Sequence, residues 1–78
     1  MILHAYIHKD KETGLFFSTT AELSGVFSQG ETIDECIRNT KEAIELALED
    51  PQDREYFGVE GSEFTIEYIV EGDVIYVR

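Results

Sequence analysis

Alternating apolar and polar positions at the start of the chain predict a β-hairpin. Every second residue from Leu3 to Ile7 is apolar within residues 1–8, which is the two-residue repeat of a strand with one buried face. Residues 9–14 are polar and are typical of a turn. Residues 15–20 are rich in aromatic and β-branched side chains, so we expect them to form the returning strand.

Two glycines bracket a short third strand, which we expect over residues 26–29. Gly25 precedes this strand and Gly30 follows it. Each glycine indicates either a turn with positive φ or a tight passage of the backbone. We therefore interpret both glycines as scaffold residues.

The strongest periodicity is helical and begins after Thr32. The Thr32 hydroxyl can accept a hydrogen bond from the amide of Glu35 while the Glu35 carboxylate reaches back to the amide of Thr32, so both residues predict a capping box and count as scaffold. Pro51 is expected to end the helix, because the residue before a proline, Asp50, avoids the helical conformation. The predicted buried stripe consists of Ile33, Cys36, Ile37, Thr40, Ala43, Ile44, Ala47 and Leu48.

A second hairpin is expected after the helix, with strands over residues 64–70 and 74–78 and a turn over 71–73. The predicted fold is α+β with the order β-β-β-α-β-β, an antiparallel sheet with one helix packed on one face, in a single domain over residues 1–78. One helix covers little of a sheet, so several apolar residues must face away from it and form a contact surface. Those residues are Tyr6, Phe16 or Phe17, Ile69, and Ile75 or Tyr76.

An excess of acidic residues restricts the classes of molecule that the protein can bind. Seventeen Asp and Glu against six Lys and Arg give a formal net charge of −11, which repels phosphate backbones and anionic lipids. The charge argues against direct nucleic-acid binding, and it fits either attraction of a basic protein partner or solubility alone. No apolar run approaches the roughly 20 residues of a membrane span and no signal peptide opens the sequence, so we expect a cytoplasmic protein.

The small size of the chain favours self-association. Seventy-eight residues bury a small core, and such domains gain stability from disulfides, metals or assembly. Cys36 is the only cysteine, so an internal disulfide is excluded. Its place on the predicted buried stripe indicates a hydrophobic filler rather than a nucleophile. A homo-oligomer is therefore expected.

Histidines and sequence motifs give no sign of a metal or catalytic site. His4 and His8 lie about 13 Å apart along one strand, too far to share an ion, although either could pair with a carboxylate across the sheet or titrate at an interface. The chain lacks a Walker loop, a Gly-x-Ser-x-Gly elbow, Cys-x-x-Cys and His-Glu-x-x-His. We therefore expect no metal, no cofactor and no enzymatic activity.

Acidic residues crowd the expected C-terminal end of the helix. Glu45, Glu49 and Asp50 lie where the helix dipole disfavours negative charge by about 0.3–1 kcal/mol each. Two interpretations stay open. These residues either present charge to a basic partner, or they are tolerated there, for example by pairing with Arg54.

Three short motifs follow one another along the chain: a Glu-Leu-x-Gly loop, a Ser-x-Gly-Glu-Thr turn, and a helix that carries Glu and then Glu-Ala. Over residues 14–46, these motifs and the end of the first hairpin resemble the core of the HicB-like antitoxin family, including its short stand-alone relatives of unknown function. The matching positions are Glu22, Leu23 and Gly25 in the loop, Ser28, Gly30 and Thr32 in the turn, and Glu35, Glu42 and Ala43 in the helix.

The sequence departs from the family pattern at several positions. Ala21 and Ser24 stand where the family has two prolines, and Val26 stands where it has a cysteine. The missing prolines loosen the loop but leave the path from strand to helix open. Full-length HicB antitoxins carry a C-terminal DNA-binding domain, whereas only a hairpin over residues 64–78 is expected here. We therefore do not infer that this chain binds operator DNA.

The resemblance implies a partial ribonuclease H-like fold without its active site, self-association, and neutralisation of a small basic RNA-cleaving toxin. The leading hypothesis is an antitoxin or antitoxin-like protein that occludes such a toxin. Two alternatives stay open: a surviving magnesium-dependent nuclease, and an orphan oligomeric domain that has no toxin partner or binds a small ligand. The residues expected at the partner contact are Tyr6, His8, Glu42, Glu45, Leu46 and Glu49.

Overall fold

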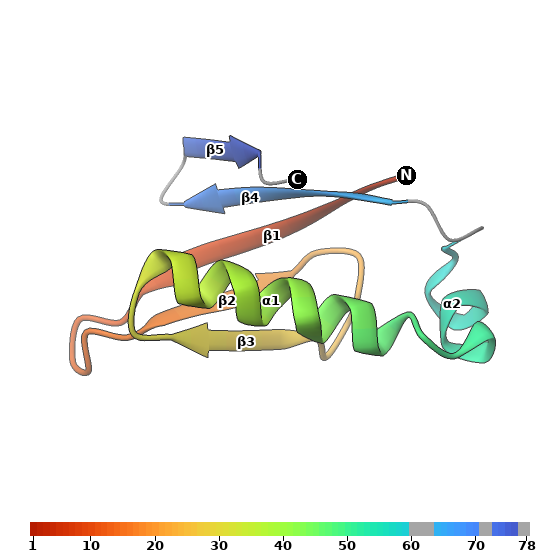
Figure 1. Ribbon diagram of the computed structural model, residues 1–78, viewed down its shortest axis with the longest axis horizontal. Coiled ribbons are helices and arrows are strands. Elements are labelled where there is room, and N and C mark those ends of the chain that lie inside the picture. Colours follow the sequence, from red (N-terminus) through yellow and green to blue (C-terminus); the bar gives the residue numbers. More distant parts are fainter. Residues whose placement is uncertain (60–63, 71–72, 77–78) are drawn as a thin grey trace.

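A β-sheet with a long helix across one face makes up most of the molecule (Figure 1). The computed structural model describes residues 1–59 and 64–70 and, for residues 73–76, the backbone. The expected turn at residues 71–72 and the expected strand residues 77–78 lie outside this described part. The elements are β1 (Ile2–Lys9), β2 (Phe16–Thr20), β3 (Phe27–Gly30), α1 (Ile33–Ala47), α2 (Pro51–Phe57), β4 (Thr65–Val70) and β5 (Asp73–Tyr76).

The strands lie in the order β3-β2-β1-β4-β5. Both expected hairpins form, since β1 pairs antiparallel with β2 and β4 pairs antiparallel with β5. The expected all-antiparallel sheet is wrong in one place, because β1 and β4 run parallel, with Ile2 opposite Thr65 and Ile7 opposite Val70. A parallel pair needs a long crossover, and the connection here contains β2, β3 and both helices. The class is therefore α+β with a mixed sheet.

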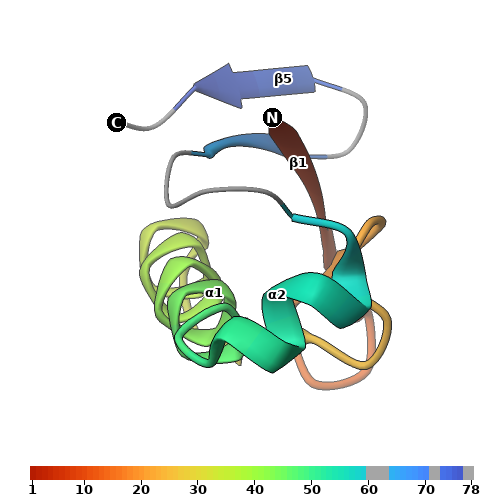
Figure 2. The ribbon, with the colours of Figure 1, turned by 90° about the vertical axis from the view of Figure 1, so that its right-hand side faces the viewer.

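The core lies between the sheet and α1. Leu3, Ala5 and Ile7 of β1 point toward the helix and are at most 2% exposed. Ile37 and Ile44 of α1 are buried against them in the core cluster, as the helical periodicity predicts. Figure 2, in which α1 is seen nearly end-on, shows α2 beside the end of α1. Within the described residues, neither helix has the length and apolarity needed to cross a membrane.

The first turns of α1 lie directly against the end of β3. A Cβ atom on Gly30 would come within 2.5 Å of the backbone nitrogen of Cys36, closer than real atoms approach. Gly30 is therefore needed for close passage of the backbone. Gly25 has a φ of 83° and open space where its Cβ would be, so its requirement is conformational.

The start of α1 is capped differently from the predicted capping box. The Thr32 hydroxyl accepts a hydrogen bond from the amide of Glu35 at 3.1 Å, as expected. The expected return bond to the Thr32 amide is wrong, because the Glu35 carboxylate accepts from the amide of Glu31 at 3.3 Å. The acidic side chain still satisfies an exposed amide at the helix start, one residue earlier than expected.

Buried hydroxyl groups connect α1 to β2. The Ser18 and Thr40 hydroxyl oxygens lie 2.6 Å apart, and each residue is 1% exposed. The Thr40 hydroxyl also donates to the carbonyl of Cys36 at 2.6 Å, so in this pair Ser18 donates to Thr40. The hydroxyls of Ser18 and Thr40 thus each have a hydrogen-bond partner, which offsets the cost of removing these two groups from water.

The expectation of a single helix is also wrong, because α2 follows α1. Asp50 is extended, with φ −82° and ψ 127°, as expected before a proline. Pro51, however, occupies the first position of α2, and the Asp50 carboxylate caps α2 by accepting from the amide of Gln52 at 2.8 Å. Asp50 therefore lies at a helix N-terminus, where the dipole favours its charge.

We expect Gly30→Ala to lower the free energy of unfolding by about 1–3 kcal/mol, the usual cost of overpacking, because the new Cβ would press on backbone atoms. Urea unfolding followed by circular dichroism measures the change. Gly25→Asn is the matched control, since asparagine tolerates a positive φ, and its loss is expected to stay below about 1 kcal/mol. Equal losses for the two variants would contradict this distinction.

Candidate functional site

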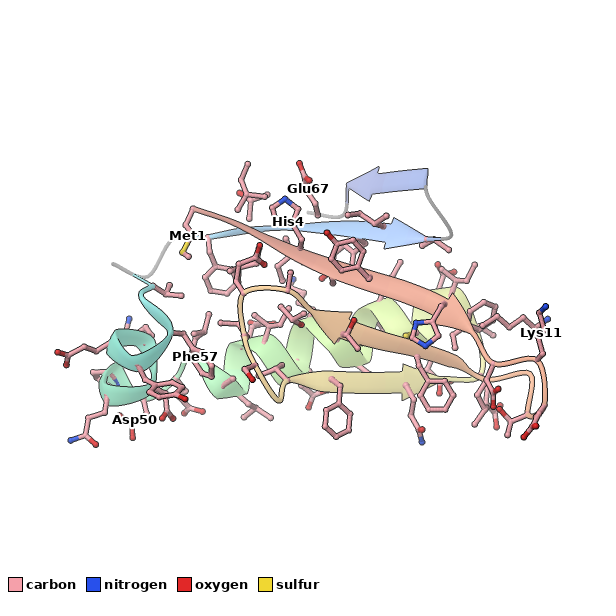
Figure 3. All side chains as sticks on the ribbon, turned by 180° about the vertical axis from the view of Figure 1, so that it is seen from behind. Met1, His4, Lys11, Asp50, Phe57 and Glu67 are labelled. Carbon is pink, nitrogen blue, oxygen red and sulfur yellow. The ribbon has the colours of Figure 1, made fainter. Side chains whose placement is uncertain are left out.

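One face of the sheet is turned away from α1 and carries exposed apolar side chains (Figure 3). Phe27 is 71% exposed, Ile2 50% and Tyr6 44%. Contiguous exposure of this kind usually marks a contact surface. We call this surface the open face, and its described residues are Ile2, His4, Tyr6, His8, Phe17, Thr19, Phe27, Gln29, Thr65, Glu67 and Ile69.

A mostly apolar row crosses the middle of the open face. The strand register places Phe27 opposite Thr19, Thr19 opposite Tyr6, and Tyr6 opposite Ile69. Directly opposed residues on neighbouring strands are in side-chain contact range. Because β1 is the middle strand, Tyr6 lies near the centre of the face.

The two phenylalanines of β2 point to opposite faces. Phe17 lies on the open face, where its ring stacks on His8 with 6.2 Å between ring centroids. Phe16 packs against the core cluster, and the Lys9 ammonium lies over its ring. Of the two residues that the sequence left open, Phe17 is therefore the one that faces away from the helix.

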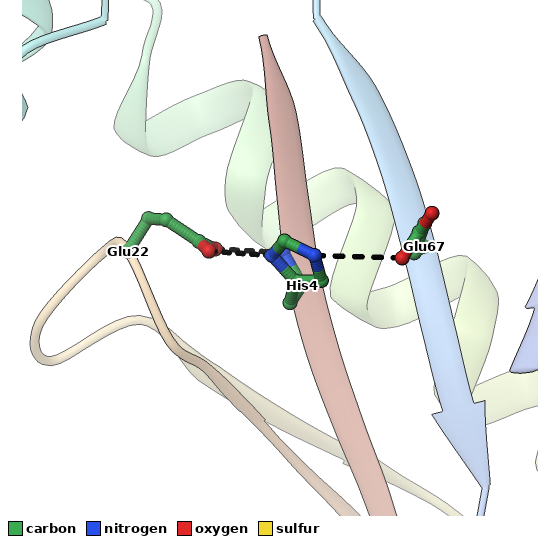
Figure 4. A network of polar contacts seen from close by, with 3 residues as sticks. All are labelled: His4, Glu22 and Glu67. Carbon is green, nitrogen blue, oxygen red and sulfur yellow. Dashed lines mark hydrogen bonds and ion pairs between the residues drawn. The ribbon is translucent and has the colours of Figure 1, made fainter.

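His4 is held on the open face between two carboxylates (Figure 4). Nδ1 of His4 is 2.6 Å from one oxygen of Glu22, whose other oxygen accepts a hydrogen bond from the His4 backbone amide at 2.6 Å. Nε2 lies 3.4 Å from the carboxylate of Glu67, which the parallel register places beside His4. We call this arrangement the His4 clamp.

The His4 clamp favours the charged form of each partner. The hydrogen bond that the His4 ring donates to Glu22 raises the pKa of His4 above 6.5. Desolvation opposes this rise, and the negative charges of Glu22 and Glu67 add to it. For Glu22, desolvation alone would raise the pKa. The hydrogen bonds from the backbone and ring of His4 outweigh it, so the pKa of Glu22 lies below 4.5. An imidazolium and two carboxylates therefore lie together on the open face.

The geometry limits the chemistry available to the described nucleophiles and bases. Both ring nitrogens of His4 face carboxylates, which favours the protonated ring. A protonated imidazole has no free lone pair, so it can neither act as a general base nor bind a metal ion. Cys36 is fully buried, and burial raises the pKa of its thiol. Among the described residues, no group of three or more His, Cys, Asp and Glu is arranged to hold a metal ion.

Each residue of the Glu-Leu-x-Gly loop has its own structural task. Glu22 holds His4, Leu23 is fully buried in the core, and Gly25 turns the chain with its positive φ. The backbone amide of Ala21 also donates to the carbonyl of His4 at 2.9 Å. The motif therefore fixes the loop between β2 and β3 onto β1.

A second surface lies on α1, on the side away from the sheet. Its residues recur at intervals of three and four along α1 and the turn after it, and all are exposed, Leu46 by 62%. Within the part of the chain that the structure describes, the carboxylates of this surface make no ion pair. The last turn of α1 contains no basic residue. We call this surface the acidic stripe, and it consists of Glu42, Glu45, Leu46 and Glu49.

One carboxylate of the acidic stripe, Glu45, affects the titration of a buried tyrosine. Tyr68 of β4 is 1% exposed, and burial, with a further contribution from the charge of Glu45, raises the pKa of its hydroxyl to about 12.

The structure divides the expected partner-contact residues between two opposite surfaces. Tyr6 and His8 lie on the open face, whereas the other four residues form the acidic stripe, and the sheet and core lie between the two sets. A small rigid partner cannot contact both sets at once.

Two residues of these surfaces escaped the sequence analysis. Glu67 meets His4 only because β1 and β4 are parallel neighbours, which local pattern does not reveal. Phe27 lies in a strand of four residues, too short for alternation to show which face its ring takes. The one available signal was its position two residues after a turn glycine.

A shallow depression between β3 and α1 offers little to a small ligand. Its lining is largely polar, and the Asn39 side chain fills part of the space by donating to the carbonyl of Gln29 at 2.8 Å. Ligand pockets are usually enclosed and mainly apolar. The residues that line the depression are Leu15, Gln29, Gly30, Glu31, Glu35 and Asn39.

A mixed sheet with one helical layer, an exposed apolar face and an acidic helix stripe define a small α+β protein with two candidate interaction surfaces. Comparison with known families takes the identification further, because residues 3–70 match the HicB_like antitoxin of bacterial toxin-antitoxin systems. The chain belongs to this antitoxin family.

Two relatives show how much of the chain is shared at the level of sequence. A UPF0150 protein of Synechocystis sp. is 43% identical over 47 residues, which cover 60% of this chain and 67% of the relative. A UPF0150 protein of Helicobacter pylori strain J99 is 48% identical over 50 residues, covering 64% of this chain and 67% of the relative. No solved structure matches the chain significantly.

The His4 clamp predicts a specific pH dependence of stability. Because folding raises the pKa of His4, its contribution is complete below pH 6.5 and is lost as the pH rises through the raised pKa. Because folding lowers the pKa of Glu22, its contribution is present above pH 4.5 and is lost as the pH falls through the lowered pKa. The clamp therefore stabilises the fold most between these two values.

We expect His4→Gln to lower the melting temperature most between pH 4.5 and 6.5, with the deficit shrinking at higher pH as the wild-type imidazole loses its proton. Thermal unfolding across this range measures the deficit. His8→Gln is the matched control, since His8 stacks on Phe17 and forms no ion pair with any described residue. A deficit that does not change with pH, or one shared by His8→Gln, would rule out the clamp.

Proposed function

We propose that this chain is a non-enzymatic antitoxin-like protein that binds a small basic RNA-cleaving protein in the cytoplasm and covers its RNA-binding surface. Membership of the antitoxin family supports a toxin as the class of partner. The observation that carries the proposal is the acidic stripe, in which three carboxylates that have no ion partner among the described residues surround an exposed leucine.

The negative charges of the acidic stripe lower the stability of the free protein, and no interaction among the described residues offsets this loss. Glu45 and Glu49 lie at the C-terminal end of α1, where each negative charge opposes the helix dipole by about 0.3–1 kcal/mol. The last turn has no basic residue to offset this cost, and no ion pair does so either. Charge that is unfavourable in the free protein becomes favourable when a basic partner docks.

The composition of the stripe fits a protein contact better than a merely solvated surface. Leu46 gives an apolar centre, and the carboxylates around it form a polar rim, which is the usual anatomy of an interface. Carboxylates in this position compete for the lysine and arginine side chains that would otherwise hold RNA phosphates. Occlusion needs no catalytic group, in keeping with the engaged His4 and the buried Cys36.

The proposal is tested by searching beside the gene for this chain for one that encodes a small basic protein, and by assaying that protein for cleavage of a fluorescent RNA. The wild-type chain should inhibit cleavage, and inhibition should weaken as salt screens the charges. Glu42→Gln/Glu45→Gln/Glu49→Gln should weaken inhibition about 10-fold. Three exposed charge pairs at about 0.5 kcal/mol each amount to about 1.5 kcal/mol, and a tenfold change in affinity corresponds to about 1.4 kcal/mol.

The matched control removes three exposed carboxylates elsewhere, in Glu12→Gln/Glu31→Gln/Asp34→Asn, and lowers the net charge equally. This variant should inhibit like the wild type. Equal loss in both variants would show a non-specific charge effect and contradict the role of the stripe. Absence of a basic neighbour, together with no bound protein in a native pull-down, would overturn the antitoxin proposal and favour an orphan domain.

A further inference from the structure

Three polar contacts attach the loop between β2 and β3 to β1, and all three go to His4. We call this loop, residues 21–26, the Glu22 loop. The Ala21 amide donates to the carbonyl of His4 at 2.9 Å. The Glu22 carboxylate accepts from the His4 amide with one oxygen and faces Nδ1 of the ring with the other, each at 2.6 Å. Attachment of the loop therefore depends on a residue whose charge changes within the physiological pH range.

Two features of the Glu22 loop favour opening. The loop has no proline to fix its φ angles, so the chain gains conformational entropy when the loop is released. Thr20, from which the loop departs, is 7% exposed, and its hydroxyl has no hydrogen-bond partner among the described residues. Opening gives this hydroxyl access to water. Burial of Leu23 and Val26 and the contacts to His4 oppose opening.

The two carboxylates around the His4 ring are matched to its protonated form. Figure 4 shows the ring between Glu22 of the loop and Glu67 of β4, with Nδ1 2.6 Å from the first carboxylate and Nε2 3.4 Å from the second. A carboxylate only accepts hydrogen bonds, so both ring nitrogens must carry hydrogen for both contacts to be favourable. A neutral ring carries one such hydrogen and turns a lone pair toward one carboxylate. Loss of the proton therefore weakens the His4 clamp in either tautomer.

We propose that the His4 clamp is a pH-sensitive switch that holds the Glu22 loop closed on β1 when the ring is protonated, and that deprotonation lets the loop open while the rest of the fold stays intact. The rest of the fold has contacts of its own, since the Ser18 and Thr40 hydroxyls join α1 to β2 away from this loop. The switch is independent of the toxin-binding proposal. It is also distinct from global unfolding, because only the loop is released.

The groups around His4 set the direction of the switch. Glu22 from the loop and Glu67 from β4 are the charged groups that face the ring, and Tyr6 is the nearest titratable side chain along β1 on the open face. The bond to Glu22 raises the pKa of His4 above 6.5. Closure is therefore strongest below pH 6.5 and weakens as the pH rises through the raised pKa. The bond to Glu22 then loses its charged donor, and charge-assisted hydrogen bonds are roughly twice as strong as neutral ones.

Hydrogen exchange of the full chain, followed by NMR from pH 6 to pH 8.5, tests the proposal. Protection factors correct for the intrinsic effect of pH on exchange, and they report opening at the amides of His4, Ala21 and Val26, whose bonds involve the loop. These factors should fall about 5-fold as the charge assistance is lost. They should also lie at least about 10-fold below the protection of Ile44, a fully buried residue within α1 that exchanges through global unfolding.

Constant protection of the three amides across this pH range would overturn the proposal. Protection equal to that of Ile44 would overturn it as well, because the loop would then open only when the whole chain unfolds. Either result is obtained on the wild type alone, without a variant that has to fold.

Three variants that change one carboxylate to an amide test the mechanism. Glu22→Gln keeps an oxygen for the His4 amide but removes the charge, so the loop amides should be weakly protected at every pH. Glu67→Gln should keep the loop closed at pH 8.5, because an amide can donate to the lone pair of a neutral ring. Glu12→Gln, at an exposed position in the turn after β1, is the matched control and should behave like the wild type. A full pH response in Glu22→Gln, or its loss in Glu12→Gln, would contradict the switch.

Discussion

One helix can cover one face of a sheet, and this constraint shapes the molecule. α1 is held close to β3 by the absence of a side chain at Gly30 and is joined to β2 by the Ser18 and Thr40 hydroxyls. With α1 on one side, Leu3, Ala5 and Ile7 are buried and the alternate residues of β1 are left toward solvent. The open face and the acidic stripe are the two outer surfaces of this two-layer arrangement.

The two surfaces differ in how they handle charge. On the open face, the His4 clamp brings the nearby carboxylates into ion pairs, and the loop that carries Glu22 is fixed by the buried Leu23. On the acidic stripe, the carboxylates find no ion partner among the residues that the structure describes, and those at the C-terminal end of α1 oppose the helix dipole. Compensated charge gives a basic partner little to attract it to the open face, whereas the uncompensated charge of the acidic stripe suits a partner of opposite sign.

Local pattern predicted the hairpins, the buried stripe of α1 and the extended Asp50, because each depends on neighbours within a few residues. The parallel pairing of β1 with β4 was missed because it joins segments about sixty residues apart and leaves no local periodicity. The Glu22 and Glu67 partners of His4 follow from that pairing and from the loop, so they were missed as well. Pro51 was interpreted only as the end of the first helix, although proline is equally suited to the first position of a new helix.

The central claim is that a basic partner binds to the acidic stripe and not to the open face. Chemical-shift mapping of the isotope-labelled chain, titrated with the toxin-like partner, measures this directly. The account predicts shift changes that centre on Glu42, Glu45, Leu46 and Glu49. Changes that centre instead on Tyr6 and Phe27, with the acidic stripe unaffected, would contradict the account.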